Sequence, residues 1–354
     1  MNPGEPASVA ESDETQGVGS SRLRLPTQKL AINGGLLVLA IVILVILPPL
    51  LNGFQQLLMT KFLILAIFGM GYNIIYGYGG MLSLGHGAFF GIGVYSVGLL
   101  WLHAGINNLW LSIPVSIIMA LIGGLILSFF FLRMSGVYFL LITFGLSQLL
   151  YAMAWSIDWF NSSGMQGISD IKLPSIGFSG FGWTNISFYY LVLVFFLICY
   201  FLIKKIVDSP FGHAIVGVRE GEKRMQVLGY NVWLTRYIAL VLSAGFCGFA
   251  GMLFAYNNSF AHPTHLGFVY SWIPMLVVIV GGAGTKLGPI IGAMIVVWLE
   301  YLVSSVTPYR WPLIMGAFFI AVIMYFRGGV VLWISRALDR MSRRRAASVG
   351  DGSA

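Results

Sequence analysis

Apolar residues form long stretches of this chain, and polar residues gather in the intervals between them. A bilayer core requires about 20 consecutive apolar residues in helical form. Residues 62–132, 134–157 and 237–285 contain no Asp, Glu, Lys or Arg, so each holds at least one such helix. The pattern predicts an all-α fold, a polytopic transmembrane helix bundle of about ten spans. These lie at residues 30–50, 56–77, 84–103, 109–132, 137–157, 186–203, 234–256, 268–283, 287–304 and 311–327.

The interval between the spans 268–283 and 287–304 is rich in residues that interrupt helices. Its sequence is GGAGTKLGP, which includes Gly281, Gly282 and Pro289. Glycine and proline are the strongest local breakers of a helical pattern. Two interpretations follow, a tight turn between two spans or a break within one longer, re-entrant element.

The composition agrees with a membrane protein. The 354 residues are 58% hydrophobic and 9% charged, whereas soluble domains are roughly 45–50% apolar and about 25% charged. The net charge of +8 indicates membrane orientation rather than nucleic-acid binding, because basic residues gather in cytoplasmic loops. With both termini cytoplasmic, 17 of the 20 Lys and Arg residues fall inside. The exceptions are Lys61, Lys172 and Arg310.

The polar segments divide the chain into three parts. Residues 1–29 are rich in Ser, Gly, Pro and acids, which predicts a disordered cytoplasmic tail. Residues 30–327 form the transmembrane domain, with a large outer loop at 158–185 and a charged cytoplasmic loop at 204–236. Residues 328–354 form a basic cytoplasmic tail.

Several chemistries are excluded by the motifs that the sequence lacks. It contains no GxxxxGK[ST], HExxH, CxxC or GxSxG sequence, so the chain has no phosphate-binding loop of its own and we expect no enzyme activity. Ion-coupled transport requires an ionisable group inside the bilayer. The spans hold few such groups, Lys61 and Glu300 near the outer ends and His86 near the inner end, which disfavours a secondary transporter. The two cysteines, at 199 and 247, are expected to be buried apolar residues.

The cytoplasmic loop has the features of a contact surface for another protein. Ser209-Pro210 predicts the start of a helix, with serine as N-cap and proline at the first position. One or two short helices on the membrane surface are expected over residues 209–231. The sequence SPFGHAIVGVREGEKRMQVLGYN resembles the coupling loop of the branched-chain amino acid permease family of ABC importers, of the LivM type. The resemblance extends to residues 72–95, 136–150, 243–255 and 281–293.

This resemblance implies a permease subunit without catalytic activity of its own. Its implied partners are a second, homologous permease in a heterodimer, two cytoplasmic ATPase subunits that bind ATP and Mg, and a periplasmic substrate-binding protein. The implied location is the bacterial inner membrane, with several passes through the lipid bilayer, and the implied cargo is a branched-chain or other hydrophobic amino acid. The residues implied to couple transport to the ATPase are Ser209, Pro210, Phe211, Gly212, Arg219, Glu220, Leu228 and Gly229.

Polar groups within or next to the spans are candidates for the translocation path. They are Asn73, His86, Thr143, Gln148, Gly164 and Gln166. In hydrocarbon such groups must find partners, so the alternative is that they join helices to one another. Gly164 and Gln166 lie in a segment that the family usually writes TGGxxGL, but this chain has Ser162 and Ser163 in place of the threonine and a glycine. His262 and His265 are too few to predict a metal site.

Two other functions fit the same features. A urea or short-amide permease shares the scaffold and coupling loop of the family. A passive channel or stand-alone facilitator belongs to a different class and needs no partner.

Overall fold

The computed structural model describes residues 42–134, 136–160, 167–175, 184–306, 311–325, 328–331 and 333 of the 354. The chain divides into two units, Met1–Leu47 and Pro48–Ala354. In the first unit, residues 42–46 are helical. The remainder of the span predicted at 30–50 lies either outside the described residues or, at 48–50, in a short 3-10 helix of the second unit. The tail predicted at 1–29 and nearly all of the one at 328–354 lie outside them as well.

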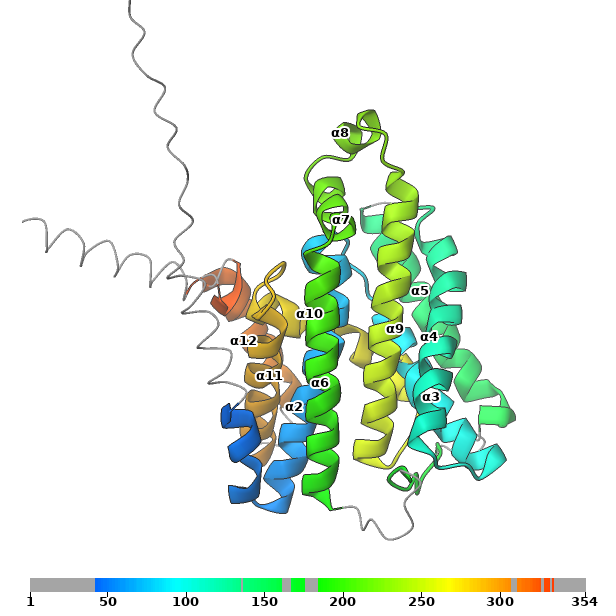
Figure 1. Ribbon diagram of the computed structural model, residues 1–354, viewed down its shortest axis with the longest axis vertical. Helices are drawn as coiled ribbons and strands as arrows, with labels where there is room; N and C mark the ends of the chain where they lie inside the picture. The colour runs from blue at the N-terminus through cyan, green and yellow to red at the C-terminus, as the bar shows by residue number, and fades with distance from the viewer. Residues whose placement is uncertain are drawn as a thin grey trace, which may run out of the picture. The chain divides into compact units, whose positions relative to one another are not determined.

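The second unit is helical throughout its described part, with only two isolated β-bridges (Figure 1). Its helices are α2 (Gly53–Asn73), the π-helical η2 (Ile74–Tyr78), α3 (His86–Ala104), α4 (Leu109–Phe131), α5 (Val137–Ser156), α6 (Asn185–Val207), α7 (Pro210–Glu220), α8 (Glu222–Val227), α9 (Val232–Asn258), α10 (Phe268–Gly281), α11 (Gly288–Val306) and α12 (Trp311–Tyr325). Short 3-10 helices occur at η1 (Pro48–Leu50), η3 (Asp158–Phe160) and η4 (Pro263–Leu266).

Among these described residues, seven helices are long and apolar enough to cross a membrane, and α10 is a shorter apolar helix. Their bounds lie within a few residues of the predicted spans. The largest extension is at α6, which continues from the predicted end at 203 to Val207. The all-α prediction is confirmed for the described part of the chain, while the count of ten spans stays a prediction.

Several helices begin at polar residues that cap their free N–H groups. Asn108 accepts from the N–H of Trp110 at 3.0 Å, Thr184 from that of Ser187 at 3.3 Å, and Asn231 from that of Leu234 at 3.0 Å. These side chains satisfy donors that have no partner within the helix. The helix starts are therefore set by residues that stand at the boundary between polar and apolar sequence.

The helices α2 and α9 form the centre of the unit. Most of α2 is buried, as is most of α9, whereas α4 and α5 expose much of their apolar surface. A Cβ at Gly93 of α3 would overlap the backbone of Gly248 in α9, and one at Gly251 would overlap the carbonyl of Phe90. Small residues thus let these helices approach closely, as expected where lipid removes the hydrophobic drive between helices. Cys199 and Cys247 are buried free thiols, as predicted.

Two non-helical segments run beside the helices of the bundle. Residues 79–85 turn back next to α2, where Tyr72 donates to the carbonyl of Ser83 at 3.0 Å. The segment that contains η4 lies along α3, with Ala261 next to Gly98 and Leu266 next to Gly91. Serine and threonine side chains bind their backbone, including Ser147, which donates to the carbonyl of Leu266 at 2.8 Å. Irregular backbone at membrane depth requires such protein partners.

The glycine-rich interval at 281–289 is a tight turn between two separate helices. The helix α10 ends at Gly281 and α11 begins at Gly288. Gly282 has φ of 123° and Gly284 has φ of 75°, values that glycine adopts without steric cost. The structure shows a turn between two helices, as the first interpretation requires; that both helices are spans stays a prediction, because α10 is shorter than the seven long apolar helices.

Candidate coupling site at the α7–α8 end

The predicted surface helices of the 209–231 loop are present as α7 and α8, which lie together beyond the ends of α6 and α9 (Figure 1). Ser209 caps α7, since its hydroxyl accepts from the N–H of Gly212 at 3.3 Å, and Pro210 occupies the first turn. A Cβ at Gly212 would overlap the carbonyl oxygen of Val207. Glycine at this position therefore permits the sharp corner between α6 and α7.

The helix α8 is separated from α7 by Gly221 and closed by Gly229. The φ of Gly229 is 85°, and the next residue, Tyr230, donates its N–H to the carbonyl of Met225 at 3.0 Å. This left-handed glycine ends the helix and returns the chain to α9. The prediction that one or two short helices stand in this loop is confirmed.

One face of α7 packs on the bundle and α8 projects from it. Ala214, Ile215 and Val218 are buried, while no residue of α8 is buried. At the end of α8, Val227 is 87% exposed and Leu228 is 70% exposed. Two adjacent apolar side chains so fully exposed outside the spans form a surface suited to a protein partner.

Arg219 connects α7 to the end of α2. Its guanidinium donates to the carbonyl of Gly77, which lies in the π-helical turn η2. A Cβ at Gly77 would overlap the side-chain amide of Asn73. This hydrogen bond from a charged group links α7 directly to the end of α2. Turns of π-helix are frequent at functional sites.

Asn73 extends the same connection to the turn between α10 and α11. Its Oδ1 accepts from the N–H of Gly284 at 3.0 Å, and its Nδ2 donates to the carbonyl of Thr285 at 3.1 Å. Asn73 therefore joins α2 to the α10–α11 turn within this chain, and its part in a translocation path stays a prediction. We call the set formed by Asn73, Gly77, Arg219, Gly284 and Thr285 the inner junction.

An ion pair fixes the α10–α11 turn to the corner between α6 and α7. Lys286 donates to both carboxylate oxygens of Asp208, at 2.6 and 2.8 Å. This hydrogen-bonded ammonium holds the pKa of Asp208 below its ordinary value. Asp208 and Lys286 were not among the coupling residues implied by the sequence, although an unpaired acid directly before Ser209 and a lone lysine in the turn were visible signals.

Two clefts flank α7 and α8. One has a volume of about 440 Å³ and lies between Arg219, Glu222 and the turn from α4 to α5. The other, of about 640 Å³, continues along α8 to Trp233. Arg236 of α9 lines both clefts and pairs with Glu222 at 2.9 Å. These clefts form concave surfaces at the α7–α8 end that a partner protein can fill.

His86 lies at the start of α3 in a fully buried polar cluster. Its ring nitrogens are 2.9 Å from the hydroxyl of Ser83 and 3.0 Å from that of Ser243. Ser243 also donates to the carbonyl of Gly71 at 2.7 Å. The partners of the His86 ring are thus the hydroxyls of two serines. Within this single chain the cluster joins α2, α3 and α9, and its part in a path stays a prediction.

The polar residues of α5 meet the two non-helical segments. Thr143 accepts from the N–H of Leu84 at 3.1 Å and is itself buried. Gln148 has a buried Nε2 without a hydrogen-bond partner among the described residues. Gly164 and Gln166 lie outside the described residues. A substrate-lining role for these positions stays a prediction.

His262 and His265 stabilise their own turn. The N–H of His262 donates to Nδ1 of His265 at 3.1 Å, and Nδ1 of His262 lies 3.0 Å from the hydroxyl of Thr264. In the described part of the chain, no group of three or more His, Cys, Asp and Glu residues could hold a metal ion.

A bundle of long apolar helices with two short helices projecting from one end is typical of a membrane transport permease, and sequence comparison shows this class. Residues 56–327 match the family model of the permease component of branched-chain amino acid transport systems. The chain belongs to this family and is a multi-pass membrane protein of transport, not an enzyme.

Curated relatives include permeases named for different cargoes. The high-affinity branched-chain amino acid transport system permease protein LivM of Escherichia coli is 29% identical over 294 residues, covering 77% of this chain and 68% of the relative. The probable LivM of Methanocaldococcus jannaschii is 24% identical, covering 67% and 73%. The galactose/methyl galactoside import permease protein MglC of Escherichia coli is 29% identical, covering 58% and 62%. No solved structure matches the chain significantly.

Proposed function

We propose that this chain is the permease subunit of an ATP-driven importer and carries branched-chain or other hydrophobic amino acids into the cell. The observation that supports it most is the inner junction, in which a helix outside the bundle binds the end of α2 through Arg219 and Gly77. An ATP-driven permease that has no nucleotide-binding motif of its own needs such a connection to an external ATPase.

The junction suggests how the force is transmitted. A partner ATPase that closes on ATP would push α8 and α7 together as a rigid body. Arg219 would pass that movement to η2, and Asn73 would pass it to the α10–α11 turn. The Lys286–Asp208 pair keeps this turn attached to the α6–α7 corner, so three helix ends would shift together and open the bundle alternately to its two sides.

The proposed assembly contains two ATPase subunits, a second homologous permease and a periplasmic binding protein, with ATP and Mg held by the ATPases. It lies in the bacterial inner membrane, with α7, α8 and both termini in the cytoplasm and ten spans in all. This arrangement follows from the charge asymmetry of the sequence and from the family to which the chain belongs.

The amino acid cargo is favoured by the relatives of this chain. LivM proteins of two further organisms are similar to it over two thirds or more of its length. The relative named for galactose matches a smaller share of the chain. A urea or short-amide permease, and a passive facilitator, remain the competing functions.

Uptake of radiolabelled leucine into proteoliposomes separates these functions. The complete assembly with ATP should accumulate leucine, whereas the chain alone should not. Replacing Arg219 by alanine should lower ATP-driven uptake roughly tenfold, because a hydrogen bond to a charged group contributes about 1.5 kcal/mol. Lys205→Ala, at an exposed position of α6, is the matched control.

Each competing outcome has a clear meaning. Uptake by the chain alone would show a facilitator. Transport of urea instead of leucine by the complete assembly would show an ATP-driven importer with a different cargo. Unchanged ATP-driven uptake in Arg219→Ala would refute the junction as the coupling route.

A further inference from the structure

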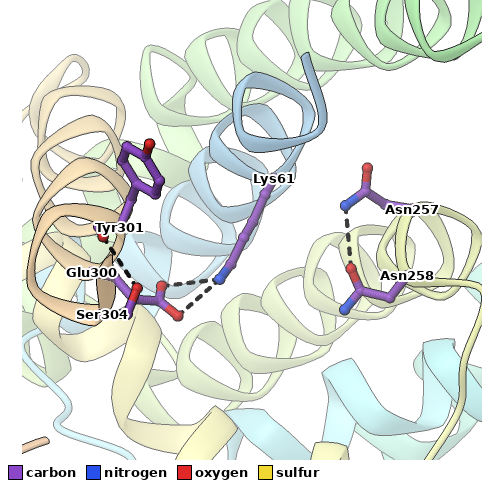
Figure 2. Close-up of polar contacts among 6 residues, drawn as sticks. All are labelled: Lys61, Asn257, Asn258, Glu300, Tyr301 and Ser304. Atoms are coloured by element: carbon purple, nitrogen blue, oxygen red, sulfur yellow. Dashed lines mark hydrogen bonds and ion pairs between the residues drawn. The ribbon is translucent and has the colours of Figure 1, made fainter. Parts of the chain in front are cut away.

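An ion pair lies within the helices at the end of the bundle opposite α7. Lys61 of α2 donates to both oxygens of Glu300 in α11, at 2.9 and 3.0 Å (Figure 2). Lys61 stands eight residues after the first residue of α2, and Glu300 six residues before the last residue of α11. At ~1.5 Å per residue these positions are about 9–12 Å inside the helix ends. The pair is therefore placed at the depth of the outer hydrocarbon region of a bilayer.

A pocket of about 290 Å³ adjoins this pair. Its size is near the lower limit of the ~300–1,000 Å³ range of small-molecule sites. Its polar lining comes from Lys61, Glu300, Ser304 and the two asparagines at the end of α9, Asn257 and Asn258. Figure 2 shows the ion pair and the two amides on different sides of one opening. The remaining lining is mostly apolar, from Phe54, Leu57, Leu58, Val297 and Tyr301.

The polar groups of the pocket retain capacity for further bonds. The side chain of Lys61 is 27% exposed and that of Glu300 is 31% exposed, so a ligand can reach both charges. Asn257 uses its Nδ2 to bind Oδ1 of Asn258 at 3.3 Å. Its own Oδ1 is buried without a hydrogen-bond partner among the described residues. The two asparagines add polar surface to the pocket wall next to the ion pair.

Charge balance restricts what this pocket can bind. Ionised groups at membrane depth are costly and mark functional sites. Lys61 and Glu300 together are neutral, so a net anion or cation would leave one uncompensated charge in a region of low dielectric constant. A dipolar ion adds one charge of each sign and leaves the sum at zero. Its carboxylate would face the ammonium of Lys61, and its ammonium would face the carboxylate of Glu300.

We propose that the pocket between α2, α9 and α11 binds the zwitterionic head of an α-amino acid, with the amino acid side chain against the apolar wall that includes Phe54, Leu57 and Tyr301. This inference rests on the proposed function, because the site lies at the end from which an importer receives its cargo. According to this proposal, the permease itself selects ligands that carry one positive and one negative charge.

Direct binding to the purified full-length chain tests this site without the ATPases. Isothermal titration with leucine is compared with its decarboxylated analogue isopentylamine and with 4-methylpentanoate, which lacks the amino group. Wild type should bind leucine at least about tenfold more tightly than either analogue, the ratio that corresponds to ~1.4 kcal/mol. Glu300→Gln should lose the preference over 4-methylpentanoate, and Lys61→Met should lose the preference over isopentylamine.

Two variants separate loss of the site from loss of the fold. The exchange Lys61→Glu with Glu300→Lys retains an ion pair and should still bind leucine. Lys172→Met removes a lysine outside the pocket, placed over the ring of Trp101, and should leave all three affinities unchanged. Equal binding of the three ligands by wild type, no leucine binding at millimolar concentration, or unaltered preferences in both single variants would overturn the proposal.

The uptake assay with the complete assembly distinguishes failure of the proposed pocket from failure of the proposed function. ATP-driven leucine uptake together with any of these negative binding results rejects the pocket and keeps the importer. Absence of ATP-driven uptake in wild type rejects the proposed function, whatever the purified chain binds.

Discussion

Individual glycines and polar side chains determine how α7 and α8 attach to the helices of the bundle. Gly212 permits the corner after α6, Gly77 permits the close approach of Asn73, and Gly229 ends α8. Arg219 and Asn73 then bind backbone groups of neighbouring elements. Because these contacts are to the backbone, they hold helix ends in place independently of the apolar side chains around them.

Replacement of Gly212 by alanine should destabilise the α6–α7 corner. The added Cβ would overlap the carbonyl oxygen of Val207, a backbone atom that cannot move alone, and steric strain of this kind costs about 1–3 kcal/mol. Thermal unfolding of the purified chain in detergent measures the effect. Gly145→Ala in α5 is the control, since a Cβ there meets nothing within 4 Å. Equal melting temperatures for the two variants would contradict the prediction.

The Asp208–Lys286 pair should remain formed well into the acid range. Hydrogen bonding to Lys286 lowers the pKa of Asp208, so the folded state favours the carboxylate more than the unfolded state does. The stabilisation is present above the unfolded pKa of about 3.9 and is lost as the pH falls through the lower folded value.

The difference in melting temperature between wild type and Asp208→Asn measures this linkage. It should be constant from pH 7 to about pH 4, near the unfolded pKa, and should shrink below that. Lys286→Ala removes the main cause of the lowered pKa of Asp208. In that background, the difference in melting temperature caused by Asp208→Asn should be smaller across the whole pH range. A difference that disappears between pH 7 and about pH 5 would be inconsistent with a lowered pKa.

At the scale of elements, the short helix α8 is distinguished by the exposure of its side chains. None of its residues is buried, and the apolar side chains of Val227 and Leu228 are exposed at its end. Full burial of a valine or leucine side chain contributes about 1.5–3 kcal/mol. Most of the energy for partner binding at this end is therefore expected from two adjacent residues.

Replacing Val227 and Leu228 together by serine should abolish stable association with the ATPase. Co-purification with ATPase subunits, quantified by binding isotherms, should show a loss of at least about 100-fold, which is ~2.7 kcal/mol. Gln226→Ser, an exposed polar residue of the same helix, should bind as wild type does. Retained affinity in the double variant would show that the partner contacts another surface.

The elements also show how two non-helical segments between the long helices are accommodated. Residues 79–85 and the segment around η4 lie against α2 and α3, where side chains such as Tyr72 and Ser147 bind their backbone. Each helix that follows, α3 or α10, begins within the bundle. The partners that make an irregular backbone tolerable come from the packed helices, in the case of Ser147 from a position 119 residues away.

At the scale of the whole molecule, orientation and span count can be tested together. The two native cysteines are buried, so single introduced cysteines can be labelled in intact cells. His213→Cys in α7 should react only from the cytoplasm, and Ile106→Cys, between α3 and α4, only from outside. Ser12→Cys should react from the cytoplasm if ten spans place both termini on one side.

Other labelling patterns would correct specific parts of this arrangement. Reversal of the first two positions would invert the bundle and contradict the charge asymmetry. External labelling at position 12, with the other two as expected, would show an even number of spans between positions 12 and 106, where three are predicted.

The sequence by itself determined the lipid environment, the helical class, the helix bounds and the surface helices of the 209–231 loop. Those properties depend on hydrophobicity, capping residues and glycines that act over one or a few turns. The tertiary structure decided which polar groups meet, because Lys61 and Glu300 are 239 positions apart, and Asn73 and Thr285 are 212 apart. Pairing over such separations depends on how whole helices pack, which no local pattern records. The surface helices of the proposed coupling loop were therefore visible in the sequence, whereas the inner junction and the charged pocket became visible only in the fold.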